Sequence, residues 1–318
     1  MKKIAIQLFG HLRSYRKAYK SLSSRVISVL RGEGYDIDIF LHTWSETDTS
    51  EKSWHNLYGD KRGRAVDDTD IEFIKEAYNP KYFLIEEPLK LVQDFEFIER
   101  VEGVPRQYFS VINSLYTRYK VNEMRIKYEK ENNIEYEYVI QTRPDIKFEE
   151  PFILKNFLQP FHKCSLSLPE NTLFYASSYF ARGDVESDEL VGGTDLINFA
   201  KPAAMNKVNN FYEDINSGKI EKEWIIENCF SLEALQFIYW RTLGLYCVKL
   251  RYFYGESFVI LRNIKEYSKL HDPKSPPIQR HTSGRELFLR LLRKSLKFLP
   301  YCCVYRAIDK LNKKIKIR

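Results

Sequence analysis

Apolar residues in the first 150 positions come in short runs with strand character, separated by longer stretches of helical composition. The strand-like runs are rich in Ile, Val, Phe and Tyr and cover residues 3–9, 35–41, 82–86 and 138–148. Residues 17–30 and 108–131 have the composition of helices. This alternation predicts an α/β domain with a mainly parallel sheet and helices on both faces.

Polar residues directly follow three of the predicted strands. Open parallel sheets bind ligands at the carboxyl ends of their strands, which lie along one edge. We therefore expect the polar residues at these ends to form one ligand site. They are Gly10, His11 and Arg13 after the first strand, His42 and Thr43 after the second, and Arg143 and Asp145 within the run YVIQTRPDIKF. For His42, a buried structural hydrogen bond is the alternative.

The last of these strand ends places a cation and a carboxylate two residues apart, on either side of Pro144. The guanidinium of Arg143 can bind a phosphate through two parallel hydrogen bonds, while Asp145 can bind a divalent cation or a ribose hydroxyl. Pro144 fixes its own φ angle and so stiffens the pair. With the other polar strand ends beside it, the pair favours a diphosphate site. The alternative is an ion pair that closes a turn.

Positive charge is concentrated at the C-terminal end of the chain. Residues 285–318 hold eleven Lys or Arg and two acidic residues, a net charge of +9, whereas the whole chain carries +7. Leu289, Leu292 and Leu296 recur among the basic residues at spacings of three and four. This pattern predicts short amphipathic helices, interrupted at Pro300, that lie on an anionic membrane surface. A terminal helix packed on the domain is the alternative.

Composition excludes several other classes of protein. A hydrophobic share of 44% is ordinary for a folded chain, and no apolar run reaches the roughly 18 residues of a spanning helix. The five cysteines show no CxxC spacing, which argues against a zinc site or a disulfide framework. Basic residues do not cluster near the predicted site, which argues against nucleic acid. We predict a catalytic domain over residues 1–270, a Pro-containing connector over 271–284, and a membrane-associating tail over 285–318.

Three segments, IAIQLFGHLRSY, DIDIFLHTW and YVIQTRPDIKF, occur in this order along the chain. In combination they resemble a family of bacterial glycosyltransferase-like proteins from surface-polysaccharide gene clusters, grouped with the WavE-like lipopolysaccharide-synthesis proteins. The likeness spans roughly residues 1–240. It implies a GT-A-like, Rossmann-type fold, in which a nucleotide sugar lies across the ends of the parallel strands. It also implies a peripheral position at the cytoplasmic face of the bacterial inner membrane.

The resemblance further implies a D-x-D motif that holds a metal on the donor diphosphate, and here the chain departs from the pattern. Arg143 stands at the first acidic position and Asp145 at the second. Mn²⁺ or Mg²⁺ can still bind through Asp145 and the phosphates, since these ions accept few protein carboxylates. Alternatively, Arg143 itself neutralises the leaving diphosphate.

Acidic residues in the second half of the chain supply candidates for the catalytic base. The segment SDELVGGTDLINFAKPAAM contains Asp188 and Asp195, and the resemblance implies that one of them faces the acceptor. A solvated surface turn is the alternative for both. Glu233, near the start of a predicted buried helix, is a further candidate, although carboxylates at helix starts are ordinarily structural. Tyr239 and Trp240 of this helix are predicted to lie in the core.

The predicted function is transfer of a sugar, such as a hexose, from a nucleotide donor to a lipid-linked surface glycan of the lipopolysaccharide, O-antigen or capsule type. Arg13, Arg143 and Asp145 would hold the diphosphate, and Asp188 or Asp195 would deprotonate the acceptor hydroxyl in an inverting reaction. Two other functions stay open. One is a polysaccharide phosphotransferase that uses the same strand ends, and the other is a non-catalytic scaffold of the polysaccharide machinery.

Overall fold

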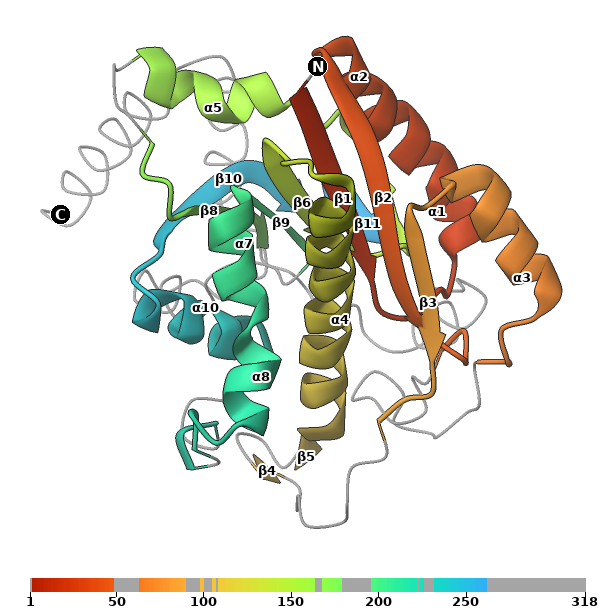
Figure 1. Ribbon diagram of the computed structural model, residues 1–318, viewed down its shortest axis with the longest axis vertical. Helices are drawn as coiled ribbons and strands as arrows, with labels where there is room; N and C mark the ends of the chain where they lie inside the picture. Colours follow the sequence, from red (N-terminus) through yellow and green to blue (C-terminus); the bar gives the residue numbers. More distant parts are fainter. Residues whose placement is uncertain are drawn as a thin grey trace, which may run out of the picture. The chain divides into compact units, whose positions relative to one another are not determined.

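The computed structural model (Figure 1) describes residues 2–48, 63–89, 98–99, 105–106, 108–163, 168–178, 196–221, 223–225 and 232–261. The chain divides into two compact units. The first comprises Met1–Leu154 and Leu168–Arg262, and the second comprises Lys155–Ser167 and Asn263–Arg318. Within the second unit, the described residues 155–163 belong to helix α5 (Leu154–Lys163). The predicted connector and basic tail lie outside the described residues.

The first unit is built on a mixed sheet whose nine described strands follow the order β3-β2-β1-β6-β9-β8-β10-β11-β7. These strands are β1 (Lys2–Phe9), β2 (Tyr35–Trp44), β3 (Tyr82–Glu86), β6 (Tyr138–Thr142), β7 (Ile146–Phe148), β8 (Thr172–Ser178), β9 (Ile197–Ala200), β10 (Tyr246–Tyr254) and β11 (Phe258–Ile260). β4 (Ile98–Glu99) and β5 (Pro105–Arg106) form a separate antiparallel pair. β9 runs antiparallel to β6 and β8, and β7 runs antiparallel to β11. The other pairs are parallel, so the predicted α/β class with a mainly parallel sheet is confirmed.

The helices predicted at residues 17–30, at 108–131 and near Glu233 are present, whereas the other described helices were not predicted. The described helices are α1 (Tyr15–Leu22), which continues through a π-helical turn into α2 (Ser28–Gly32), then α3 (Asp68–Phe73), α4 (Tyr108–Asn132), α5, α7 (Pro202–Asn209), α8 (Phe211–Asn216) and α10 (Leu232–Thr242). Asp67 begins α3 with a capping box, because its side chain accepts from the Asp70 N–H and Asp70 reaches back to the Asp67 N–H. None of these helices combines the length and apolar composition needed to cross a bilayer.

Helices cover both faces of the sheet, with α4, α7 and α8 on one face and α1 and α2 on the other (Figure 1). Side chains alternate along β1, as in any strand. Ala5 and Phe9 belong to the apolar core that includes α4, and Gln7 Nε2 donates to Asn122 Oδ1 of α4 at 3.0 Å. The alternate positions point to the opposite face and are fully buried: Ile4, Ile6 and Leu8.

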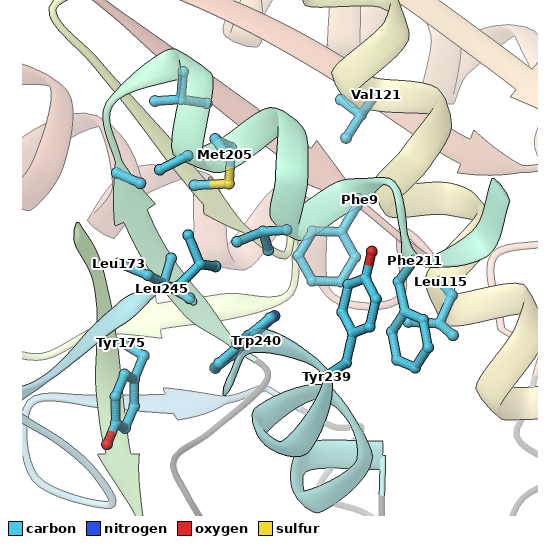
Figure 2. Packing of buried hydrophobic residues seen from close by; sticks show 14 of the residues in the cluster. Phe9, Leu115, Val121, Leu173, Tyr175, Met205, Phe211, Tyr239, Trp240 and Leu245 are labelled. Carbon is cyan, nitrogen blue, oxygen red and sulfur yellow. The ribbon is translucent and has the colours of Figure 1, made fainter. Parts of the chain in front are cut away.

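The core on the α4 face joins the sheet to α4, α8 and α10 (Figure 2). Phe211 stacks on Tyr239 with ring centroids 3.9 Å apart and planes inclined by 6°. The Tyr239 hydroxyl donates to Asp214 Oδ2 at 2.8 Å, so its polar end is satisfied as well. Tyr239 and Trp240 are each 2% exposed, which confirms their predicted place in the core.

A polar layer lies within this face of the sheet, directly below the strand ends. Gln7 and Gln141 are register partners on β1 and β6, and Gln141 Nε2 donates to Gln7 Oε1 at 3.1 Å. Arg118 of α4 donates to Gln141 Oε1 at 2.8 Å, while its guanidinium lies 3.9 Å from the centre of the Phe9 ring. A buried amide that lacks a hydrogen bond lowers the stability of the fold. A shift of β1 against β6 would break several of these side-chain hydrogen bonds at once. The layer therefore fixes which residues stand at the strand tips.

Candidate functional site

The carboxyl ends of β1, β2 and β6 lie side by side. In the parallel ladders Phe9 stands opposite His42, and Leu8 stands opposite Thr142. The chain runs from β1 outward to β2 and β3 on one side, whereas β6 lies on the other side of β1. The direction of chain progression therefore reverses between β1 and β6. In open α/β sheets, ligands bind beyond the strand ends at such a switch point.

Arg13, Arg143 and Asp145 converge beyond this switch point. Arg143 holds Asp145 in a two-pronged pair, in which Nε donates to Oδ1 at 2.9 Å and Nη2 donates to Oδ2 at 2.6 Å. Arg13 Nη1 donates to the same Oδ2 at 3.2 Å, and Arg13 Nε donates to Asp48 Oδ1 at 2.9 Å. These four side chains, two guanidiniums and two carboxylates, are called the Arg–Asp cluster below.

The members of the Arg–Asp cluster differ in burial. The side chain of Asp145 is fully buried, whereas those of Arg143, Asp48 and Arg13 are 14%, 17% and 18% exposed. Burial by itself raises the pKa of Asp145, but the charges and hydrogen bonds of Arg143 and Arg13 outweigh it and hold the pKa below the ordinary 3.8. Asp145 is therefore ionised at neutral pH.

Two residues with positive φ shape the turn that carries Arg13. Gly10 has a φ of 91°, which side chains rarely tolerate, and its N–H donates to Thr117 Oγ1 of α4 at 3.0 Å. Arg13 has a φ of 45°, in the left-handed region, and its N–H donates to the Thr47 carbonyl oxygen at 2.9 Å. The turn is thus bonded to α4 at one end and to the segment after β2 at the other.

His11 lies in the same turn and is held in one tautomer. Its Nδ1 lies 3.1 Å from the backbone oxygen of Glu46, and because that oxygen can only accept, Nδ1 carries the proton. Burial, together with the charges of Arg13 and Arg143, lowers the pKa of His11 to about 4, against the opposing effects of the Glu46 carbonyl and Asp48. His11 is therefore a neutral imidazole at pH 7, placed in the field of the cluster.

His42 belongs to a separate chain of hydrogen bonds that supports the turn after β1. In the neutral ring of His42 the proton is on Nε2, which faces the carboxylate of Glu86, so Nδ1 accepts from the Thr117 hydroxyl at 2.6 Å, and Thr117 Oγ1 in turn accepts from the Gly10 N–H. His42 Nε2 then donates to Glu86 Oε2 at 2.8 Å. Burial lowers the pKa of His42, although the bond to Glu86 opposes this effect. The fully buried His42 thus makes the structural hydrogen bonds that the sequence left open as an alternative.

Two of the remaining predicted site residues, Thr43 and Glu233, are described and do not belong to the Arg–Asp cluster. Thr43 follows His42 on β2, so it points to the opposite face, where it is fully buried and its Oγ1 has no hydrogen-bond partner among the described residues. Glu233 lies partly buried in the first turn of α10. Asp188 and Asp195 lie outside the described residues.

The contacts of Asp145 do not fit a metal ligand in this arrangement. Both of its carboxylate oxygens accept from guanidiniums, and a cation beside them would meet two positive charges. Among the residues that the structure describes, no group of three or more His, Cys, Asp or Glu side chains is placed to hold a metal ion. The predicted use of Mn²⁺ or Mg²⁺ through Asp145 therefore stays a prediction, and no chemical step below depends on it.

Sequence reasoning missed three residues of this region: Asp48, Glu86 and Thr117. Glu86 is the last residue of β3, so applying the strand-end rule to a fourth strand would have found it. Thr117 lies in the middle of the 25-residue helix α4, where a hydroxyl carries no distinctive pattern. Asp48 stands in the polar segment SETDTSEKS, which offers several equivalent acids.

Comparison with known proteins gives no further assignment. No family model matches the chain, and no curated protein matches it. The likeness to WavE-like proteins therefore stays a prediction from three short segments.

Replacing Asp145 by Asn leaves two guanidiniums without their shared countercharge. We expect the free energy of unfolding to fall by about 3 kcal/mol at pH 7, because removal of one partner from a buried ion pair leaves the other uncompensated. Urea unfolding followed by circular dichroism measures the change. Asp36→Asn, which breaks the more exposed 2.7 Å pair with Lys3, is the control and should cost less than about 1 kcal/mol. Equal losses in the two variants would contradict the central place given to Asp145.

The lowered pKa of His11 predicts a specific pH dependence of stability. Between pH 6.5 and about 4 the unfolded chain binds a proton at this histidine while the folded chain does not, so the free energy of unfolding falls as pH falls. In His11→Gln this contribution is absent, and the slope over this window should be smaller by up to about 1.4 kcal/mol per pH unit. Urea unfolding at a series of pH values tests this, and parallel curves for the two proteins would refute it. The contribution of His42 to this slope is the same in both proteins and so cancels in the comparison.

Proposed function

We propose that the protein is a glycosyltransferase that moves a sugar from a nucleotide donor to a lipid-linked surface glycan. The observation that carries the proposal is the convergence of Arg13 and Arg143 on Asp145 at the switch point between β1 and β6. Guanidiniums bind phosphate oxygens through paired N–H donors, and this edge of an α/β sheet is where nucleotides bind. The mainly parallel sheet with this site at its edge agrees with the GT-A-like fold, which is part of the proposal.

The chemistry proposed for the cluster is stabilisation of charge on the leaving group. As the bond between the sugar and the diphosphate breaks, negative charge grows on the departing nucleoside diphosphate. Arg13 and Arg143 are already oriented by carboxylates and by the backbone, so little reorganisation is needed when that charge develops. In this proposal the two guanidiniums do the work that a metal does in D-x-D enzymes.

The acceptor side of the reaction has candidates only from the sequence. An inverting transfer needs a base that removes the proton of the acceptor hydroxyl while the donor bond breaks. Asp188 or Asp195 is proposed for this part, with Glu233 as a further candidate.

Isothermal titration with UDP, GDP, CDP, ADP and dTDP, with and without Mn²⁺, tests donor binding. We expect one of them to bind, and Arg143→Lys to weaken that binding by about tenfold or more, because lysine keeps the charge but loses the two-pronged geometry. Arg64→Lys is the matched control, since Arg64 forms a comparable pair with the buried Asp70 at 2.6 and 2.9 Å. Failure of every diphosphate to bind, in either condition, would refute the proposed donor site.

Product analysis with a radiolabelled form of the bound nucleotide sugar then separates the reaction classes. A glycosyltransferase leaves the sugar in the glycan and releases the nucleoside diphosphate. Phosphate from the donor in the polymer would instead indicate a phosphotransferase. Normal glycan production in cells that carry only Arg143→Lys would indicate a scaffold.

We also propose that the enzyme works at the surface of an anionic membrane, where a lipid-linked acceptor resides. The support comes from the sequence of residues 285–318, with its net charge of +9 and its interleaved leucines. A chain truncated before Arg285 should no longer sediment with vesicles that contain phosphatidylglycerol, while its diphosphate binding should be unchanged. Sedimentation with neutral phosphatidylcholine vesicles is the control. Retention of the truncated chain in the anionic pellet would refute the anchoring role of the tail.

A further inference from the structure

Glu86 presents one carboxylate oxygen at the edge of the sheet where the proposed diphosphate site lies. It is the last residue of β3 and stands opposite Trp44, the last residue of the parallel strand β2. Its Oε2 accepts from His42 Nε2 at 2.8 Å and from the Tyr116 hydroxyl at 3.0 Å. Its Oε1 accepts no hydrogen bond from the residues that the structure describes. The carboxylate is therefore oriented through one oxygen, and the other is left for a ligand.

The contacts of Oε2 also fix the charge of Glu86. The hydrogen bond from His42 lowers the pKa of Glu86 below its ordinary 4.5, against the opposing effect of burial. Glu86 is therefore ionised at neutral pH, and an ionised carboxylate can only accept hydrogen bonds. The partner of Oε1 must accordingly be a donor.

A cation stands beside this oxygen. Lys120 Nζ, from α4, lies 3.8 Å from Glu86 Oε1, which is beyond hydrogen-bond distance, and within the described part of the chain it makes no hydrogen bond. The side chains of Lys120 and Glu86 are 30% and 29% exposed, so a ligand can reach both from solvent. Because an ammonium group only donates, the two side chains offer a donor and an acceptor next to each other with no net charge.

These features match two neighbouring hydroxyl groups of a sugar ring. One hydroxyl can donate to Glu86 Oε1 while the next accepts from Lys120 Nζ. An anion or a cation would be attracted by one member of the pair and repelled by the other, whereas neutral hydroxyls use both. The partly buried ring of Tyr116, whose centre lies 5.7 Å from Lys120 Nζ, adds an apolar surface for the carbons of the sugar.

The Glu86–Lys120 pair lies within reach of the Arg–Asp cluster. β3 is two places from β1 in the sheet, which is roughly 10 Å at the usual spacing of strands. Aromatic rings connect the two places: the centre of the His11 ring lies 6.4 Å from that of Trp44, and Trp44 stacks on Tyr116 at 5.7 Å. His11 belongs to the turn that carries Arg13. A nucleotide whose phosphates bind Arg13 can therefore extend to the pair.

We propose that Glu86 and Lys120 form a subsite that binds vicinal hydroxyl groups of a sugar. The inference rests on the proposed function for the source of these hydroxyls. They belong either to the ribose of the donor nucleotide or to a pyranose sugar, and the recognising chemistry is the same for both.

The hydrogen bonds of Glu86 make Glu86→Gln an informative variant. His42 and Tyr116 both donate to Oε2, so the amide oxygen of the glutamine takes that place and its NH₂ group takes the place of Oε1. The variant keeps both contacts but turns the available acceptor into a donor. Lys120→Met removes the other half of the pair and keeps the length of the side chain.

A second Lys–Glu pair on α4 supplies matched controls. Glu131 also accepts from a tyrosine, Tyr82, and lies 3.7 Å from Lys127. Tyr82 begins β3, so this pair stands at the opposite edge of the sheet from Glu86. Glu131→Gln and Lys127→Met therefore make the same chemical changes away from the proposed subsite.

Two binding measurements on the full chain distinguish the sources of the hydroxyls. Isothermal titration compares the best-bound of UDP, GDP, CDP and ADP with its 2′-deoxy form. If the subsite binds ribose, the wild type should prefer the ribo form by about tenfold, and Glu86→Gln and Lys120→Met should lose this preference. Saturation-transfer NMR with the methyl glycosides of glucose, galactose and mannose tests for a pyranose, whose signals should be lost in the same two variants.

The outcomes separate the subsite from the proposed function. Loss of the ribo preference assigns the subsite to the donor ribose, and loss of glycoside binding with unchanged nucleotide affinity assigns it to a pyranose. Variants that match the wild type in both measurements, or equal losses in the control variants, would overturn the subsite while diphosphate binding stands. If no nucleotide binds, the proposed donor site fails and the glycosides alone decide on the subsite. Urea unfolding curves show that each variant is folded.

Discussion

The buried carboxylate of Asp145 is the interaction on which the strand-tip region depends. Its two oxygens accept three N–H donors from Arg13 and Arg143, and Arg13 lies 132 residues earlier in the chain. Burial alone would favour the protonated acid, but the two guanidiniums keep it ionised. Its backbone oxygen also binds the residue that follows β11. Charge therefore joins the end of β1 to the end of β6, and a backbone hydrogen bond joins Asp145 to the residue after β11.

Below this cluster the sheet is stiffened by polar contacts of a different kind. The amides of Gln7 and Gln141 bond across β1 and β6, and the chain of bonds from Gly10 through Thr117 to His42 joins two strands to α4. These contacts specify register and turn geometry through hydrogen bonds between neutral groups. A site that stabilises developing charge needs donors that do not move, and a support of this kind supplies such rigidity.

The sequence predicted the first strands, the long helix and the convergence of polar strand ends because each depends on local pattern and on one rule of parallel sheets. The antiparallel directions of β9 and β7 were not predicted, since strand direction depends on chain connections across the whole sheet, and the single strand-like run over 138–148 forms two strands, β6 and β7. Asp48 was missed because nothing local distinguishes it from other acids of a polar segment; its partner, Arg13, lies 35 residues away. For His42, the sequence correctly predicted a position at the end of a strand. Only the contacts with Thr117 and Glu86 show that both ring nitrogens of this neutral imidazole are hydrogen-bonded.

A diphosphate site made of arginines faces a constraint that a metal site does not. A metal can arrive with its ligand, whereas built-in guanidiniums must be neutralised in the folded protein before any ligand is present, or their mutual repulsion opposes folding. Here the carboxylates of Asp145 and Asp48 supply the negative charge that neutralises the two guanidiniums. Asp145 is enclosed and accepts from both arginines, whereas the partly buried Asp48 accepts from Arg13. In the proposed donor site, the carboxylates that neutralise Arg13 and Arg143 also orient the two guanidiniums, so the charge balance and the geometry of the site depend on the same contacts.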